Sequence, residues 1–251
     1  MPTIYLSPST QEFNLFITGG SEEQHMNDIV DAMIPYLERY GINFSRNTPD
    51  MTAASSIAAS NAGNYDFHIA LHSNASAEGS AGQNRGPIIF YYPSSSNGQR
   101  MAEIMRQNLT GIYPLPNLVR TMQTTTLGEV SRTRAPSVLI EIAFHDNWAD
   151  ANWIVNNKDL IALALSNSIA EYFGIPTTAT NPSVQNRPVM GKVVLNSGYL
   201  NIRNGPSLNN PVIGMAPNGV NVVIIRRVGD WYQINYNNMN GYVYGQYIRL
   251  I

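Results

Sequence analysis

The stretch YDFHIALHSNAS, residues 65–76, is the most informative segment in the first half of this chain. Its apolar run from Phe67 to Leu71 contains one histidine, and polar residues follow directly after His72. Such a run indicates a buried strand, which is typical of a mostly parallel sheet covered by helices. We therefore expect His72 at the carboxyl end of a strand, where open α/β sheets collect their functional side chains.

The segments around this strand alternate between strand and helix patterns. Further strands are expected at 3–6, 42–47, 87–92 and 137–144, and helices from about residue 21 and at 51–62, 96–112 and 157–175. This alternation predicts an α/β fold, a mostly parallel sheet flanked by helices, for residues 1–176.

The chain changes character after this region. Residues 177–189 are rich in Thr, Asn and Pro, which predicts a linker. Residues 190–251 show short apolar runs separated by Gly, Asn and Asp turns, which predicts a small all-β barrel.

Composition excludes several classes of function. Charged residues make up 13% of the 251 residues and the formal net charge is −2, which argues against a nucleic-acid-binding protein. No cysteine is present, so a metal would have to be held by His, Asp or Glu. No apolar run approaches the roughly 20 residues of a membrane span. The start, MPTIYLSPST, does not have the pattern of a signal peptide, so we expect a protein that stays in the cytoplasm until released or leaves without a signal.

Two polar residues on predicted strands are candidates for chemistry. Glu141 lies within the aliphatic strand SVLIEIAF, where a carboxylate is costly unless it is paired, metal-bound or protonated. Pairing with Arg132 or Arg134 would give it a structural role instead. His72 on its own could equally be a hydrogen-bonded core histidine, and His68, on the same face of the strand, is interpreted as structural.

A histidine at a strand end, a glutamate at a helix start and a glutamate on a strand suit a zinc hydrolase. Imidazole and carboxylate can bind the ion, and a further carboxylate can act as general base on the bound water. The spacing alone does not establish this function.

The first half, about residues 3–175, resembles the zinc-dependent N-acetylmuramoyl-L-alanine amidases of the type 3 family. The resemblance rests on EEQHMN (22–27), HIALHSNAS (68–76) and APSVLIEIAFHDN (135–147). It implies that Glu23, four residues before Asn27, and His72 are zinc ligands and that Glu141 is the catalytic glutamate. Asn74, in the H-x-N-A motif, is expected to orient the substrate.

One position departs from the family pattern. The first zinc ligand of the family is a histidine after the first strand, and this chain has Phe13 where close relatives carry it; Thr10 is the other such position. The third ligand is therefore not identified. Glu12 or Glu22 could replace it, whereas His25 should lie on a different helix face from Glu23.

The second half resembles the bacterial SH3-like cell-wall-binding domain. LNIRNGPS (200–207) matches its strand and turn signature, and GDWYQINY (229–236) follows in the expected place. Many tyrosines in this half suit either a peptide or glycan groove or the core of a very small barrel.

Together these features predict a peptidoglycan hydrolase, an endolysin or autolysin, that cleaves the amide between N-acetylmuramic acid and L-alanine. Its partner would be bacterial peptidoglycan, its cofactor zinc and its place of action the cell wall. The alternative is a catalytically degenerate amidase domain that only binds the wall, motivated by Phe13. An unrelated deacylase or peptidase is a third, weaker interpretation.

Overall fold

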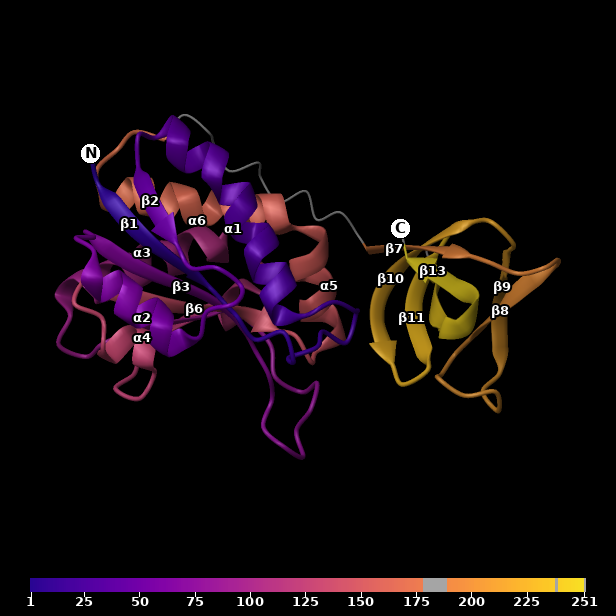
Figure 1. Cartoon of the computed structure of the whole chain (residues 1–251). Helices are drawn as coiled ribbons and strands as arrows, with labels where there is room; N and C mark the ends of the chain where they lie inside the picture. The colour runs from indigo at the N-terminus through magenta and orange to yellow at the C-terminus, as the bar shows by residue number, and fades with distance from the viewer. Residues whose placement is uncertain (178–188, 238, 251) are drawn as a thin grey trace. The chain divides into compact units, whose positions relative to one another are not determined.

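The computed structural model describes residues 1–177, 189–237 and 239–250 (Figure 1). The chain divides into two compact units, residues 1–184 and 185–251. The predicted linker, residues 177–189, lies almost wholly outside the described residues, so its extent stays a prediction.

The first unit is a six-stranded sheet flanked by helices. Strands β1, β2, β3 and β6 run parallel, β4 is antiparallel to β6, and β5 is parallel to β4, in the order β2-β1-β3-β6-β4-β5. This confirms the mostly parallel sheet. The elements are β1 (Thr3–Pro8), α1 (Glu22–Arg39), β2 (Asn43–Arg46), α2 (Ala53–Ala62), β3 (Phe67–Asn74), β4 (Ile88–Tyr91), α3 (Ser96–Thr110), the 3-10 turn η1 (Pro116–Leu118), β5 (Arg120–Gln123), α4 (Gly128–Ser131), β6 (Ser137–Phe144), α5 (Trp148–Asn156) and α6 (Lys158–Tyr172).

The two faces of this sheet are unlike. On one face, Ile69 and Leu71 of β3 are fully buried in a large apolar core that α1, α3 and α6 complete. On the other face, His68 and His72 of the same strand lie toward the short helices α2 and α4, which Figure 1 shows on the opposite side from α1 and α6. Side chains alternate along a strand, so β3 serves the apolar core and a polar face at once.

Helix α1 begins where the sequence predicts it. Ser21 has an extended backbone and its side chain accepts a hydrogen bond from the backbone N–H of Gln24, which caps the helix. The apolar positions from Met26 to Leu37 are buried at helical spacing. The cap therefore fixes the first helical residue, Glu22, beside the carboxyl end of β3.

A buried carboxylate ties the end of β6 to its surroundings. Asp150, fully buried in α5, accepts hydrogen bonds from Arg85 Nε at 2.9 Å and from the hydroxyl of Tyr113 at 2.5 Å. It also accepts from the backbone N–H groups of Gly86 and Phe144. Four donors compensate for the desolvation of this carboxylate, so it anchors the strand that carries Glu141.

The second unit is a seven-stranded antiparallel sheet, as predicted for this half. Its order is β13-β7-β10-β11-β12-β8-β9, and every pairing of adjacent strands is antiparallel. The elements are β7 (Val189–Val193), β8 (Tyr199–Arg203), β9 (Val212–Pro217), β10 (Asn221–Val228), β11 (Trp231–Tyr236), β12 (Met239–Tyr244), the 3-10 turn η2 (Gly245–Tyr247) and β13 (Ile248–Leu250). No helix among the described residues of either unit is long and apolar enough to cross a membrane.

Candidate functional site

The candidate site lies at the carboxyl ends of β1, β3 and β6. His72 of β3 and Glu141 of β6 are direct partners in the register of these two parallel strands. Paired positions on neighbouring strands place their side chains on the same face of the sheet. The topology thus brings together two residues that are 69 positions apart in the sequence, the difference between 141 and 72.

His72 is held between two buried carboxylates. Its Nδ1 lies 2.9 Å from Oε1 of Glu22, and its Nε2 lies 3.1 Å from Oε2 of Glu129. Burial alone would lower the pKa of His72, but hydrogen bonds to Glu129 and Glu22 and their negative charges raise its pKa far above the ordinary value. The raised pKa favours the protonated imidazole, in which each ring nitrogen donates to one carboxylate.

Glu22 is a fixed part of this arrangement rather than a surface residue. Only 1% of it is exposed, and it accepts hydrogen bonds from Asn14 Nδ2 at 2.7 Å and from the backbone N–H of Ser73 at 3.2 Å. Burial opposes the ionised form, but the hydrogen bonds from His72 and Asn14 and the charge of His72 outweigh it and lower the pKa of Glu22. Glu22 is therefore a carboxylate at neutral pH.

The structure differs from the sequence prediction in which glutamate meets His72. Glu23, the predicted ligand, is half-buried one residue farther along α1, and its carboxylate accepts a hydrogen bond from Asn27 Nδ2 at 3.1 Å. Successive helical residues point about 100° apart, so only one of the pair can face β3. In this structure that residue is Glu22, and the assignment of Glu23 as a zinc ligand stays a prediction.

Glu141 combines partial burial with an unsatisfied oxygen. Its Oε2 has no hydrogen-bond partner among the described residues, and neither Arg132 nor Arg134 forms an ion pair with it in that part of the chain. Burial, together with the negative charge of Glu22, raises the pKa of Glu141 to about 7 against the opposing charge of His72. A carboxyl group of this kind can both take up and release a proton near neutral pH.

Glu129 is a site residue that the sequence prediction missed. It lies on α4, only 4% of it is exposed, and its Oε1 accepts a hydrogen bond from the hydroxyl of Ser7 in addition to the contact between its Oε2 and His72. His68, interpreted from the sequence as structural, is fully buried, with Nδ1 2.9 Å from Ser60 Oγ and Nε2 3.4 Å from Glu129 Oε1.

Asn74 lies at the end of β3, half-buried, two residues after His72. Its Oδ1 accepts a hydrogen bond from the backbone N–H of Ala75 at 2.8 Å. The structure thus gives this amide a local partner, and its contact with substrate stays a prediction.

The loop after β1 supplies no histidine to this cluster. Phe13 points into solvent with 74% of its surface exposed, while Gln11 Nε2 lies 3.3 Å from His72 Nδ1. His25 is turned away from the cluster, since its Nε2 lies 2.9 Å from the carbonyl oxygen of Gly19 and its ring packs on Phe16.

These residues do not form a complete zinc site as they are arranged. No three His, Asp or Glu side chains in the described part of the chain converge as ligands of one ion. The reason is geometric, because Glu22 and Glu129 bind opposite nitrogens of His72 and so lie on opposite sides of its ring. Among the described residues of this cluster, Glu22 and His72 lie together on the Nδ1 side and have the chemistry and proximity of two ligands of one zinc ion.

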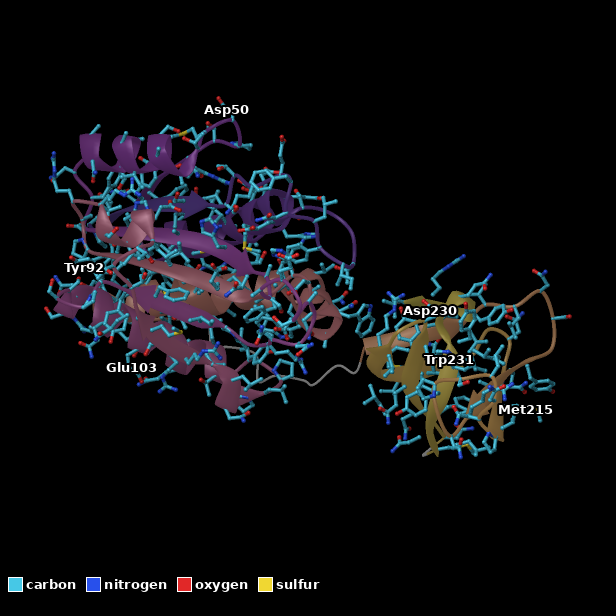
Figure 2. The ribbon with its side chains drawn as sticks, turned by 90° about the horizontal axis from the view of Figure 1, so that it is seen from below. Asp50, Tyr92, Glu103, Met215, Asp230 and Trp231 are labelled. Carbon is cyan, nitrogen blue, oxygen red and sulfur yellow. The ribbon has the colours of Figure 1, made fainter. Side chains whose placement is uncertain are left out.

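The second unit carries an aromatic pocket of about 410 Å³. Trp231, at the start of β11 (Figure 2), packs edge-on against Tyr244 with ring centroids 5.4 Å apart. Tyr199 at its margin is 65% exposed. The residues that give the pocket its character are Tyr199, Arg203, Leu208, Trp231, Tyr244 and Tyr247.

The chain matches two protein families and is similar in fold to solved amidase structures. Residues 13–171 match the family model described as N-acetylmuramoyl-L-alanine amidase, and residues 198–249 match the bacterial SH3 domain. The structure is similar to the amidase AmiC2 of Nostoc punctiforme, with a TM-score of 0.59 and 15% identity, over 69% of this chain and 97% of that chain. It is also similar to the catalytic domain of the CD27L endolysin, which targets Clostridia Difficile, with a TM-score of 0.57 and 18% identity, over 68% of this chain and 98% of that chain. At these identities the likeness shows the fold.

A curated relative adds a partial match. Bacteriocin BCN5 of Clostridium perfringens is 32% identical over 100 residues, which are 39% of this chain. The chain spans 11% of the length of that relative.

The raised pKa of Glu141 has a measurable effect on stability. The pKa of Glu141 is about 7 in the folded protein and 4.5, the ordinary value, in the unfolded chain. The folded state therefore loses stability as the pH rises from 4.5 to about 7. We predict that Glu141→Gln, which cannot ionise, gains stability relative to the parent between pH 5 and pH 8. Urea unfolding at several pH values, with a chelator present, measures this difference. A difference that does not change with pH would contradict the assignment.

Proposed function

Because the chain belongs to the N-acetylmuramoyl-L-alanine amidase family, we propose that it hydrolyses the amide bond between N-acetylmuramic acid and the L-alanine of the peptidoglycan stem peptide. The observation that carries this proposal is the pairing of Glu141 with His72 at the carboxyl edge of the sheet. This places an acid–base carboxyl group next to a fixed imidazole, which suits hydrolysis of an amide.

Glu141 performs the proton transfers in this mechanism. With a pKa of about 7, a large fraction of Glu141 is ionised at neutral pH and can accept a proton from the water that attacks the carbonyl carbon. The protonated form then donates that proton to the departing amine of L-alanine. Its unsatisfied Oε2 is free to make the hydrogen bond to this water. Glu22 and His72 hold the adjoining part of the site in place.

A catalytically degenerate wall-binding domain is the weaker alternative. Its motivation was Phe13, but Glu141 keeps the burial and the raised pKa that proton transfer needs, without a structural partner among the described residues. A degenerate site would have no reason to keep a carboxyl group in this costly state.

The bond that is cut and the role of Glu141 can be tested together. Purified peptidoglycan is digested and the new amino termini are labelled and identified. We predict new amino-terminal alanine without new reducing sugar ends, and a rate at least about 100-fold lower for Glu141→Gln. Glu38→Gln, the same change at an exposed glutamate of α1, serves as the control and should keep the parental rate. A different new terminus, or parental activity in Glu141→Gln, would rule this mechanism out.

Zinc is the cofactor that the family resemblance implies, and we propose that this chain holds an incomplete zinc site. Glu22 and His72 are the two candidate ligands, and Glu22 takes the place that the sequence pattern gave to Glu23. The missing ligand corresponds to Phe13, which is exposed on the loop that brings Gln11 and Asn14 to the cluster.

Restoring the missing side chain tests this proposal. Phe13→His adds an imidazole to the loop beside His72, so we predict that zinc binds at least tenfold more tightly than to the parent. Competition with a chelating dye measures the affinity, and Phe13→Asn serves as a polar control without an imidazole. Equal zinc affinity in Phe13→His and the parent would show that the loop does not reach the metal position.

We propose that the second unit binds the peptidoglycan on which the first unit acts, so the site of action is the bacterial cell wall. Its aromatic pocket, with Arg203 at the wall of the pocket, suits peptide or sugar groups with carboxylates. Binding of this kind raises the local concentration of substrate for a tethered catalytic unit.

Tyr199 is the residue to change in a test of wall binding. It is 65% exposed, so Tyr199→Ala should remove a contact surface without a loss of core packing. We predict that the fraction of protein that sediments with purified cell walls falls several-fold. Met215→Ala, which removes a side chain 59% exposed outside the pocket (Figure 2), should sediment as the parent does. Unchanged sedimentation of Tyr199→Ala would place the binding surface elsewhere.

A further inference from the structure

Glu129 is the most deeply buried acidic group around His72 that the proposed mechanism leaves without a task. Both of its oxygens are in use, Oε2 at 3.1 Å from His72 Nε2 and Oε1 in a hydrogen bond from the hydroxyl of Ser7. His68 Nε2 approaches Oε1 to 3.4 Å. Glu129 therefore lies among polar groups under β3 and is almost wholly shielded from solvent.

Burying a carboxylate costs free energy unless other groups replace its hydration. A carboxylate that is 4% exposed loses nearly all of its hydration, and its partners must replace that hydration. Here His72 and Ser7 hydrogen-bond the carboxylate, and His68, held by Ser60 Oγ at 2.9 Å, approaches it. An apolar side chain at position 129 would leave His72 Nε2 and the hydroxyl of Ser7 without this acceptor.

The partners of the two ring nitrogens of His72 indicate the role of Glu129. Nε2 faces Glu129, whereas Nδ1 faces Glu22 and lies 3.3 Å from Gln11 on the loop after β1. A carboxylate that holds one nitrogen of an imidazole fixes the orientation of the ring and thereby selects the nitrogen that is presented on the other side. Rotation of the ring would bring Nε2 to the Nδ1 side and break the contact with Glu129.

We propose that Glu129 is a positioning residue that anchors His72 through Nε2, so that Nδ1 is the nitrogen turned toward Glu22 and the reaction centre. The proposal rests on the proposed amidase function and adds to it a residue from α4. Ser7 and His68, the latter held by Ser60, contact Glu129 in turn.

The test compares two substitutions at position 129. Glu129→Leu keeps the bulk but cannot accept a hydrogen bond, whereas Glu129→Gln keeps an acceptor without charge. We expect Glu129→Leu to lower kcat on a soluble muropeptide by about 10–100-fold with KM unchanged, and Glu129→Gln to lower it by less than tenfold. Glu38→Gln is the matched control and should leave both constants unchanged.

Nuclear magnetic resonance supplies a readout that needs no activity. The imidazole N–H proton on Nε2 of His72, assigned by its absence in His72→Gln, should be protected from exchange in the parent and in Glu129→Gln and lost in Glu129→Leu, all in the presence of a chelator. In Glu129→Gln the signal should move upfield, because a neutral acceptor makes a weaker hydrogen bond. If Glu129→Leu does not fold, this shift in Glu129→Gln carries the test.

The possible results separate the two proposals. Parental kcat in Glu129→Leu, or an Nε2 proton signal that neither substitution changes, would overturn the role of Glu129. A parent without amidase activity whose Nε2 signal responds as expected would refute the proposed function and leave the anchoring of His72 supported.

Discussion

The imidazole of His72, held between the carboxylates of Glu22 and Glu129, is the interaction on which the candidate site depends. It joins three elements, the start of α1, the end of β3 and the short helix α4. Each group alone would be costly to bury, and together they replace the water that each has lost. The charge of His72 and that of Glu22 also act on Glu141, in opposite directions. Burial is the main cause of the raised pKa of Glu141, and these two charges modify that pKa in opposite directions.

One face of the sheet is apolar and the other is polar, and this difference explains how the fold accommodates the buried polar groups around His72. One face of β3 contributes Ile69 and Leu71 to the apolar core, and burial of each such side chain stabilises the fold by about 1.5–3 kcal/mol. The other face carries His68 and His72 under the short helices α2 and α4. The free energy gained by burying the apolar residues on one face of β3 offsets the cost of burying polar residues on its other face.

The sequence predicted the fold more fully than the site. Continuous apolar runs marked β3 and β6, helical periodicity marked α1, and the motif residues lie on these three elements. β5 and α4 have four residues each and therefore too little periodicity to be recognised, and α5 was missed as well. The sequence prediction missed Glu129 because it lies on a helix of one turn between loops. The choice between Glu22 and Glu23 depends on helix rotation at the Ser21 cap, which a motif of adjacent glutamates does not fix.

A crystal structure of the protein, determined with and without zinc, would show directly which atoms hold His72. We predict that Glu129 Oε2 lies within hydrogen-bond distance of Nε2 in both crystals, with Glu22, not Glu23, at Nδ1. We also predict that any zinc ion binds on the Nδ1 side. A His72 ring turned so that Nε2 faces the loop after β1, with Glu129 pointing away, would show that Glu129 does not anchor His72.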